Sequence, residues 1–144
     1  MKKISTKLCA LCLLCALCVG FAACEMKWDK NGDLDGMWQL TEWRNTTNGT
    51  VEKTKADGLF FSVQQDMIRI NKQSDEGYYL SLFTKRNDSL IIQSPVYWPK
   101  DSMCNISALA PFGVPGHGRF HIDMLTSENM VLSSDTAIIS FRKY

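Results

Sequence analysis

Short runs of alternating apolar and polar residues recur along most of the chain, and turn-forming residues separate them. Such alternation is the pattern of a β-strand with one buried face, whereas helical periodicity is scarce here. Intervening segments such as NTTNGT, SDEG and KRND have the composition of tight turns. The pattern predicts strands over residues 36–44, 58–64, 66–72, 77–84, 88–94, 119–125, 129–133 and 136–143.

Eight antiparallel strands within residues 36–144 predict an all-β domain. Closing them into an up-and-down barrel would leave no exposed strand edge. A barrel of this size either fills with side chains or holds one small ligand. A sandwich of seven or eight strands is the alternative architecture.

One long segment, residues 94–118, interrupts the strands and contains all four prolines of the chain. Loops of this length are unusual in a compact domain and often have a function. Its apolar residues favour an ordered structure, and CNISALA within it predicts one short helical turn. Two interpretations stay open: the segment folds over one barrel end as a lid, or it plugs the core there.

The N-terminus has the features of a secretory signal over residues 1–23: early lysines, a short uncharged apolar run and small residues at its end. The following GFAAC resembles a bacterial lipobox, which implies that Cys24 carries a lipid and becomes the N-terminus. Residues 24–35 would then be a lipidated tether. We expect a protein of the cell envelope anchored to a membrane, the outer membrane by preference, on a leaflet that the sequence does not fix.

The cysteine positions and the charge balance bear on two further properties, internal disulfides and nucleic-acid binding. Four of the six cysteines lie in the signal and Cys24 would be lipidated, so only Cys104 remains and no internal disulfide is expected. Removing the signal leaves 13 basic and 15 acidic side chains, because Lys2, Lys3 and Lys7 go with it. Nothing in this balance suggests nucleic acid as a partner.

The stretch NGDLDGMWQLTE, residues 31–42, fits two patterns. Its oxygen-bearing residues have the spacing of an EF-hand calcium loop, but such a loop needs a helix on each side, and WQLTEWRN has strand composition. The same stretch contains Gly36 and Trp38 as G-x-W, which is typical of the first strand of a small barrel. We therefore expect a strand here and no metal site.

A family resemblance supports this interpretation. DGMWQLTEW, LAPFG, GRFHIDMLTSENMVLSSD and FRKY resemble the lipocalin-like lipoproteins of Bacteroidetes over residues 33–144. The resemblance implies a lipocalin-like barrel in which Gly36, Trp38 and Arg142 are structural, with Arg142 covering Trp38 by a cation–π contact. That group largely lacks a defined biochemical function, so no catalytic residue and no cofactor are implied.

Four aromatic residues are candidates for a ligand site: Tyr79, Tyr97, Trp98 and Phe112. Tyr97 and Trp98 lie between two prolines of the long segment, and small-molecule sites are mostly apolar with a few polar groups. Alternatively these residues are core of a small barrel, which is the stronger interpretation for Tyr79.

Other residue patterns predict no chemistry. His121 and Asp123 alternate with apolar neighbours and should face solvent, and Cys104 has no nucleophile motif around it. Ser89, Ser102 and Thr136 follow aspartates in a motif resembling that for O-glycosylation of Bacteroidetes exported proteins, which is also ordinary turn chemistry.

Two functional hypotheses follow. The first is a lipid-anchored barrel that binds a small apolar or amphipathic ligand near its open end. The alternative is a protein-interaction module, such as an envelope assembly subunit or an inhibitor, with a filled barrel. An enzyme is not expected, because no set of catalytic residues is evident.

Overall fold

The computed structural model describes residues 30–144. The predicted signal (1–23), the lipidation site Cys24 and most of the tether lie outside the described residues. Within them, no helix has the length and apolar character needed to cross a membrane.

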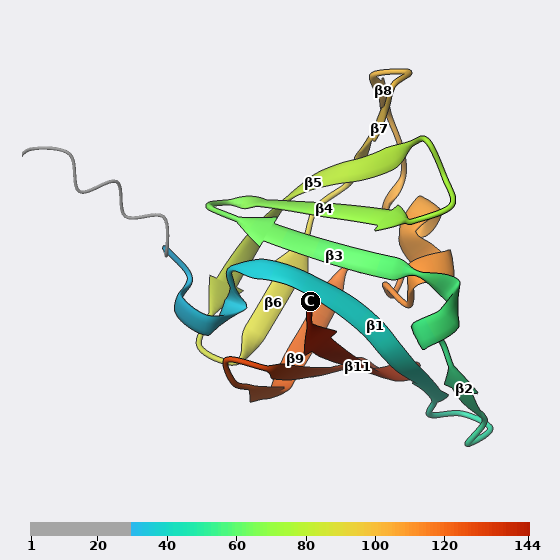
Figure 1. The fold of residues 1–144 in the computed structure, drawn as a ribbon, viewed down its shortest axis with the longest axis vertical. Helices are drawn as coiled ribbons and strands as arrows, with labels where there is room; N and C mark the ends of the chain where they lie inside the picture. Colours follow the sequence, from blue (N-terminus) through green and yellow to red (C-terminus); the bar gives the residue numbers. More distant parts are fainter. Residues whose placement is uncertain (1–29) are drawn as a thin grey trace, which may run out of the picture.

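Eight antiparallel strands close into one barrel, shown in Figure 1. Each strand pairs with the next along the chain, β11 returns to β1, and the β4–β5 pairing completes the circle. The barrel strands are β1 (Gly36–Asn45), β3 (Leu59–Gln64), β4 (Met67–Lys72), β5 (Tyr78–Arg86), β6 (Ser89–Ile92), β9 (Arg119–Leu125), β10 (Asn129–Ser133) and β11 (Ala137–Lys143). The predicted up-and-down barrel is confirmed, and the sandwich is not.

The structure adds short elements that the alternation did not predict. β2 (Val51–Lys53) pairs with the end of β1, while β7 (Val96–Trp98) and β8 (Ser102–Met103) form a ribbon on β5. Three 3-10 helices complete the set: η1 (Gly32–Leu34), η2 (Lys55–Asp57) and η3 (Ile106–Phe112). The helical turn expected in CNISALA corresponds to η3.

Inward-facing side chains fill most of the barrel. Trp38, Phe61, Ile70, Phe120 and Ile139 are each at most 1% exposed and belong to one continuous apolar core. Burial of this much apolar surface is the main favourable term in folding. Within residues 30–144, the interior of the barrel is therefore packed with side chains.

The end at which β1 begins is closed around Trp38. The indole Nε1 donates a hydrogen bond of 2.8 Å to the carbonyl oxygen of Leu34 in η1, and both residues are fully buried. The Lys143 ammonium lies 4.5 Å from the centre of the indole ring and donates to the carbonyl of Asp33. Gly36 has a φ of +121°, and a Cβ there would lie 3.0 Å from Lys143 Cε, so glycine permits this close approach.

The expected contact between Trp38 and Arg142 is wrong. Trp38 pairs in register with Lys143, and alternation along β11 places Lys143 on the same face as buried Phe141. Arg142 therefore points outward, where its Nε donates to Gln39 Oε1 at 2.8 Å. The cation–π contact exists, but the adjacent residue supplies it.

The opposite end is closed by η3, drawn in orange in Figure 1. The Asn105 side chain accepts a hydrogen bond from the backbone N–H of Ser107 at its start, and Gly113, with a φ of +83°, ends it. Leu109, Phe112 and Val114 enter the core from this segment. Of the two interpretations of residues 94–118, the structure favours the plug, although the plug is incomplete.

Trp38→Phe removes the hydrogen bond of the fully buried indole and leaves the Leu34 carbonyl without this donor. We expect the free energy of unfolding to fall by about 1–3 kcal/mol, measured by urea denaturation. Trp43→Phe is the control, because Trp43 lies on the same strand and is only partly buried. Equal losses in the two variants would contradict this role for the Trp38 hydrogen bond.

Candidate functional site

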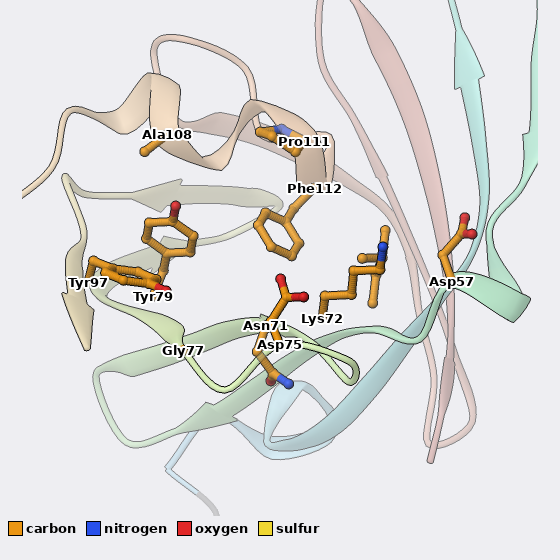
Figure 2. Close-up of a pocket in the computed structure, with 11 residues that line it drawn as sticks. Asp57, Asn71, Lys72, Asp75, Gly77, Tyr79, Tyr97, Ala108, Pro111 and Phe112 are labelled. Carbon is orange, nitrogen blue, oxygen red and sulfur yellow. The ribbon is translucent and has the colours of Figure 1, made fainter. Parts of the chain in front are cut away.

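A pocket of about 400 Å³ opens at the η3 end of the barrel (Figure 2). We call it the mouth pocket. Its walls come from strand ends, from the β4–β5 turn and from η3, and they contain both aromatic and charged side chains. The lining residues are Asp57, Leu59, Asn71, Lys72, Asp75, Gly77, Tyr79, Tyr97, Ala108, Pro111 and Phe112.

Three aromatic rings form one wall. Tyr79 is on the inner face of β5, pairs in register with Tyr97 of β7, and their ring centres are 5.0 Å apart. Phe112 from η3 meets the Tyr79 ring edge-to-face at 5.9 Å. Phe112 is buried and the two tyrosines are half-buried. The three rings therefore pack against the core on one side and line the pocket on the other. Three of the four aromatic candidates from the sequence therefore meet at this site.

Trp98 does not line the mouth pocket. It follows Tyr97 along a strand, so its side chain points to the opposite, outer face. There it stacks on Tyr78 with ring centres 5.1 Å apart and is 49% exposed. Tyr97 and Trp98 were predicted to line the same ligand site, but alternation along β7 places their side chains on opposite faces of the strand.

The absence of a side chain at Gly77 makes room for Tyr97. A Cβ at this position would overlap the Tyr97 hydroxyl oxygen and lie 2.9 Å from the carbonyl oxygen of Trp98. Any larger residue at position 77 would therefore displace the Tyr97 ring from the pocket wall.

The rim of the pocket is charged. Lys72 ends β4 and pairs in register with Leu59. Asp57 ends η2, Asp75 lies in the β4–β5 turn, and all three charged residues are exposed. Burial raises the pKa of the Tyr79 hydroxyl, and Cys104, Tyr97 and Asp75 act in the same direction. Tyr79 is therefore a neutral hydroxyl near pH 7, able to donate or accept a hydrogen bond.

The model of the lipocalin-like domain family matches residues 17–144. This chain belongs to the lipocalin-like domain family. A lipocalin-like protein from Bacteroides uniformis ATCC 8492 has a similar fold, with a TM-score of 0.59 and 23% identity over 78% of this chain and 100% of that one. The comparison with curated proteins gave no match.

Two further solved structures resemble this lipocalin-like chain. An uncharacterized protein from Bacteroides eggerthii DSM 20697 gives a TM-score of 0.53 at 25% identity, over 76% of this chain and 98% of that one. A protein from Burkholderia xenovorans gives a TM-score of 0.53 at 16% identity, over 76% and 82% of the two chains. These likenesses support the barrel fold.

The sequence did not predict the polar half of the mouth pocket. The alternation pattern placed Lys72 at the end of a strand and Asp75 and Gly77 in a turn, and it gave no reason to single out Asp57. These four residues lie beside the aromatic wall because the connections at one end of an up-and-down barrel come close together in space. The one signal available was that the turn SDEG directly precedes a strand carrying Tyr79.

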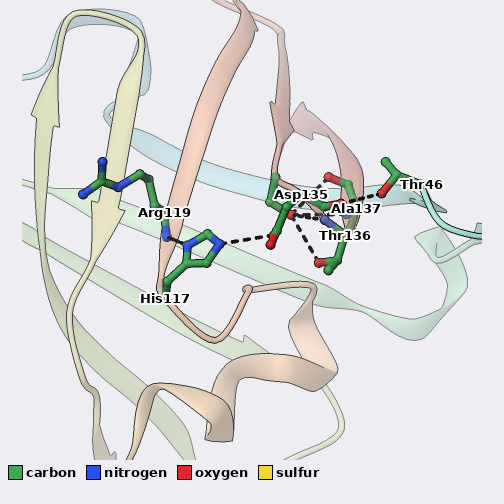
Figure 3. Close-up of polar contacts among 7 residues, drawn as sticks. Thr46, His117, Arg119, Asp135, Thr136 and Ala137 are labelled. Carbon is green, nitrogen blue, oxygen red and sulfur yellow. Dashed lines mark hydrogen bonds and ion pairs between the residues drawn. The ribbon is translucent and has the colours of Figure 1, made fainter.

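The two histidines line a second, open hollow of the lipocalin-like barrel. Figure 3 shows His117 between Arg119 and Asp135. His117 Nδ1 accepts from the backbone N–H of Arg119 and its Nε2 is 3.2 Å from Asp135 Oδ1, so the neutral ring donates from Nε2. His121 and Ser133 both bond to Asp123, not to each other, which is not the arrangement of a base activating a nucleophile. The histidine and aspartate side chains here are all more than a third exposed.

The stretch at residues 31–42 forms η1 and the start of β1. The strand is the one that the barrel interpretation predicted, and η1 was not predicted. Both Asp35 carboxylate oxygens accept hydrogen bonds from Asn31, and Glu42 forms ion pairs with Lys53 and Arg44. Those ion pairs lower the pKa of Glu42. Among the glycosylation candidates, Ser102 and Thr136 are exposed and Ser89 is half-buried.

Gly77→Ala should destabilise the protein by about 1–3 kcal/mol, because the added methyl group collides with a backbone carbonyl that cannot easily move. Gly116→Ala is the matched control: nothing lies within 4 Å of the position that its methyl group would take. We expect the control to change the free energy of unfolding by less than about 0.5 kcal/mol. Thermal or urea unfolding measures both, and equal stability of the two variants would show that Tyr97 is not held by Gly77.

Proposed function

We propose that this protein is a lipid-anchored envelope protein whose lipocalin-like barrel binds a small amphipathic ligand in the mouth pocket. The observation that carries the proposal is the combination of an aromatic wall and a charged rim around one cavity of about 400 Å³. Ligand sites are typically concave, mostly apolar and equipped with a few polar groups.

The lining suggests the chemistry of the ligand. A flat or branched apolar part would contact the rings of Tyr79, Tyr97 and Phe112, and the Tyr79 hydroxyl would offer a hydrogen bond. A polar end would lie at the rim, where Lys72 attracts a negative group and Asp75 a positive or hydrogen-bond-donating one. A purely apolar ligand would leave these rim groups unused.

The packed lumen limits the size of the ligand. Core side chains fill the barrel below the pocket, and η3 adds Leu109 and Phe112 from above. A long acyl chain has no path into the barrel interior. The ligand is therefore a compact molecule held at the mouth of the barrel, above the packed core.

The N-terminal sequence supports the envelope part of the proposal. A basic start, an apolar run and Cys24 after small residues are the pattern of lipoprotein export. Several acyl chains on one cysteine would hold the domain on a membrane, since each buried methylene contributes about 0.8 kcal/mol.

A protein-interaction module remains the second candidate function. It is favoured by the packed interior together with exposed apolar residues on the outer surface, which include Leu82 at 51% exposure and Met103 at 82%. A docked protein would cover such residues.

Native mass spectrometry of residues 25–144, purified without the lipid, tests the ligand. The barrel and its core lie within residues 30–144, so this segment contains the complete fold. We expect a stoichiometric small molecule that organic extraction removes. Tyr97→Ala should weaken its binding by about 10–100-fold, because one buried aromatic contact contributes about 1.5–3 kcal/mol.

Trp98→Ala is the matched control, since Trp98 is the next residue but lies on the outer face. It should keep the ligand. A protein without any bound molecule, which also takes up nothing from envelope extracts, would refute ligand binding. Equal loss in both variants would place the ligand outside the mouth pocket.

The lipid anchor has a separate test in the full chain. Cys24→Ser should move the protein from the detergent phase to the aqueous phase and prevent metabolic labelling with palmitate. Cys18→Ser, within the predicted signal, should leave labelling intact. Labelling of the Cys24→Ser protein would show that the anchor is elsewhere.

A further inference from the structure

The outer surface of β4, β5, β7 and β8 is unusually apolar. Met67 and Leu82 pair in register and are 42% and 51% exposed. Along the same side the apolar surface continues through three more exposed side chains on β5, β7 and β8. We call this the β5 face, made up of Met67, Leu80, Leu82, Trp98 and Met103.

The pairing of the strands makes the β5 face continuous. Leu80 pairs with Val96, and Val96 pairs with Met103 of β8. Trp98 stacks on Tyr78, and the Arg69 guanidinium lies 4.1 Å from the Tyr78 ring centre. An arginine stacked on aromatic rings can keep its charge at the surface while its apolar stem covers neighbouring apolar groups.

The charged side chains that the strands place on this outer face are basic. The four strands contain no aspartate or glutamate. Of their charged residues, Arg69 and Arg86 alternate with the inward-facing positions and lie on the outer face, whereas Lys72 lines the mouth pocket. Acidic residues are confined to the adjoining turns. On the far side of the barrel the strands do carry acids, for example Glu42 in β1 and Asp123 in β9. The β5 face therefore suits an apolar surface with a negative border.

The described chain begins at one end of this face. Lys30 donates to both carboxylate oxygens of Asp66, at 2.7 and 2.9 Å, and Asn31 Nδ2 donates to the carbonyl of Gln65. Asp66 directly precedes Met67 of the β5 face. Cys24 precedes Lys30 by six residues, so a lipid on Cys24 would be attached within about 20 Å of this point.

We propose that the β5 face lies on the lipid surface to which the chain is anchored, with the barrel on its side. This inference rests on the proposed lipid anchor. The lipid layer fits the face better than a second copy of the chain, because two such faces in contact would bring like charges together. Anionic lipid headgroups would instead pair with Arg69 and Arg86, while the apolar side chains enter the boundary layer.

The docking would also place the mouth pocket close to lipid. Tyr97 on the inner face of β7 lines the pocket, and its neighbour Trp98 belongs to the β5 face. A compact amphipathic molecule leaving the membrane would have a short path past the β7–β8 ribbon to the pocket.

Quenching of tryptophan fluorescence by lipid tests the proposal on the full lipidated protein. The protein is reconstituted in vesicles of phosphatidylethanolamine and phosphatidylglycerol with brominated acyl chains, and flotation of the vesicles reports the anchor. The reference protein carries Trp28→Phe, because Trp28 lies four residues from Cys24 and would be quenched by lipid in any orientation of the barrel. We expect part of the remaining emission to be quenched and that part to be lost when Trp98→Phe is added. Met67→Glu combined with Leu82→Glu should abolish the Trp98 quenching, because carboxylates would oppose contact with the anionic lipid.

Met124→Glu is the matched control, since Met124 is 41% exposed, like Met67, but lies on β9. It should leave the quenching unchanged, and so should Tyr97→Ala, which separates this result from ligand binding. A floating protein whose Trp98 is not quenched would overturn the docking and leave the anchor intact, while a protein that does not float would overturn both. Cross-linked dimers that disappear in the double variant would assign the β5 face to a second copy and overturn the membrane assignment.

Discussion

One edge of β5 has two partners, and both the mouth pocket and the β5 face depend on this division. Residues Phe83–Arg86 pair with β6, whereas Tyr78–Leu80 pair with β7. β6 ends at Ile92, so the first half of β5 extends past the end of its neighbour. Backbone groups left there need partners, and the β7–β8 ribbon supplies them.

This division decides where the crossing segment runs. From the ribbon the chain continues into η3, which sends Leu109 and Phe112 into the core before β9 begins. The aromatic wall forms at this place, because Tyr97 of the ribbon and Phe112 of η3 both meet Tyr79. The outer side of the same ribbon carries Trp98. Alternation along three residues of β7 thus separates a ligand site from an apolar outer surface.

The sequence predicted the barrel well, because strand alternation reports directly on which residues are buried. The eight predicted strands agree with the structure to within one or two residues at most ends. The cationic partner of Trp38 was predicted to be Arg142, but it is Lys143. The family motif indicates only that an arginine near the C-terminus covers the tryptophan. The strand register and the alternation along β11 place Lys143 there instead. The rim of the pocket was not predictable, because it is assembled from turns that only closure of the barrel brings together.

We propose a compact amphipathic ligand in the mouth pocket. A crystal structure of the protein purified gently from the cells that produce it tests this most directly. We expect electron density for a small molecule against Tyr79, Tyr97 and Phe112, with its polar end near Lys72 or Asp75. The proposal would be contradicted if the mouth pocket contained only ordered water while a molecule that co-purifies with the protein was bound elsewhere.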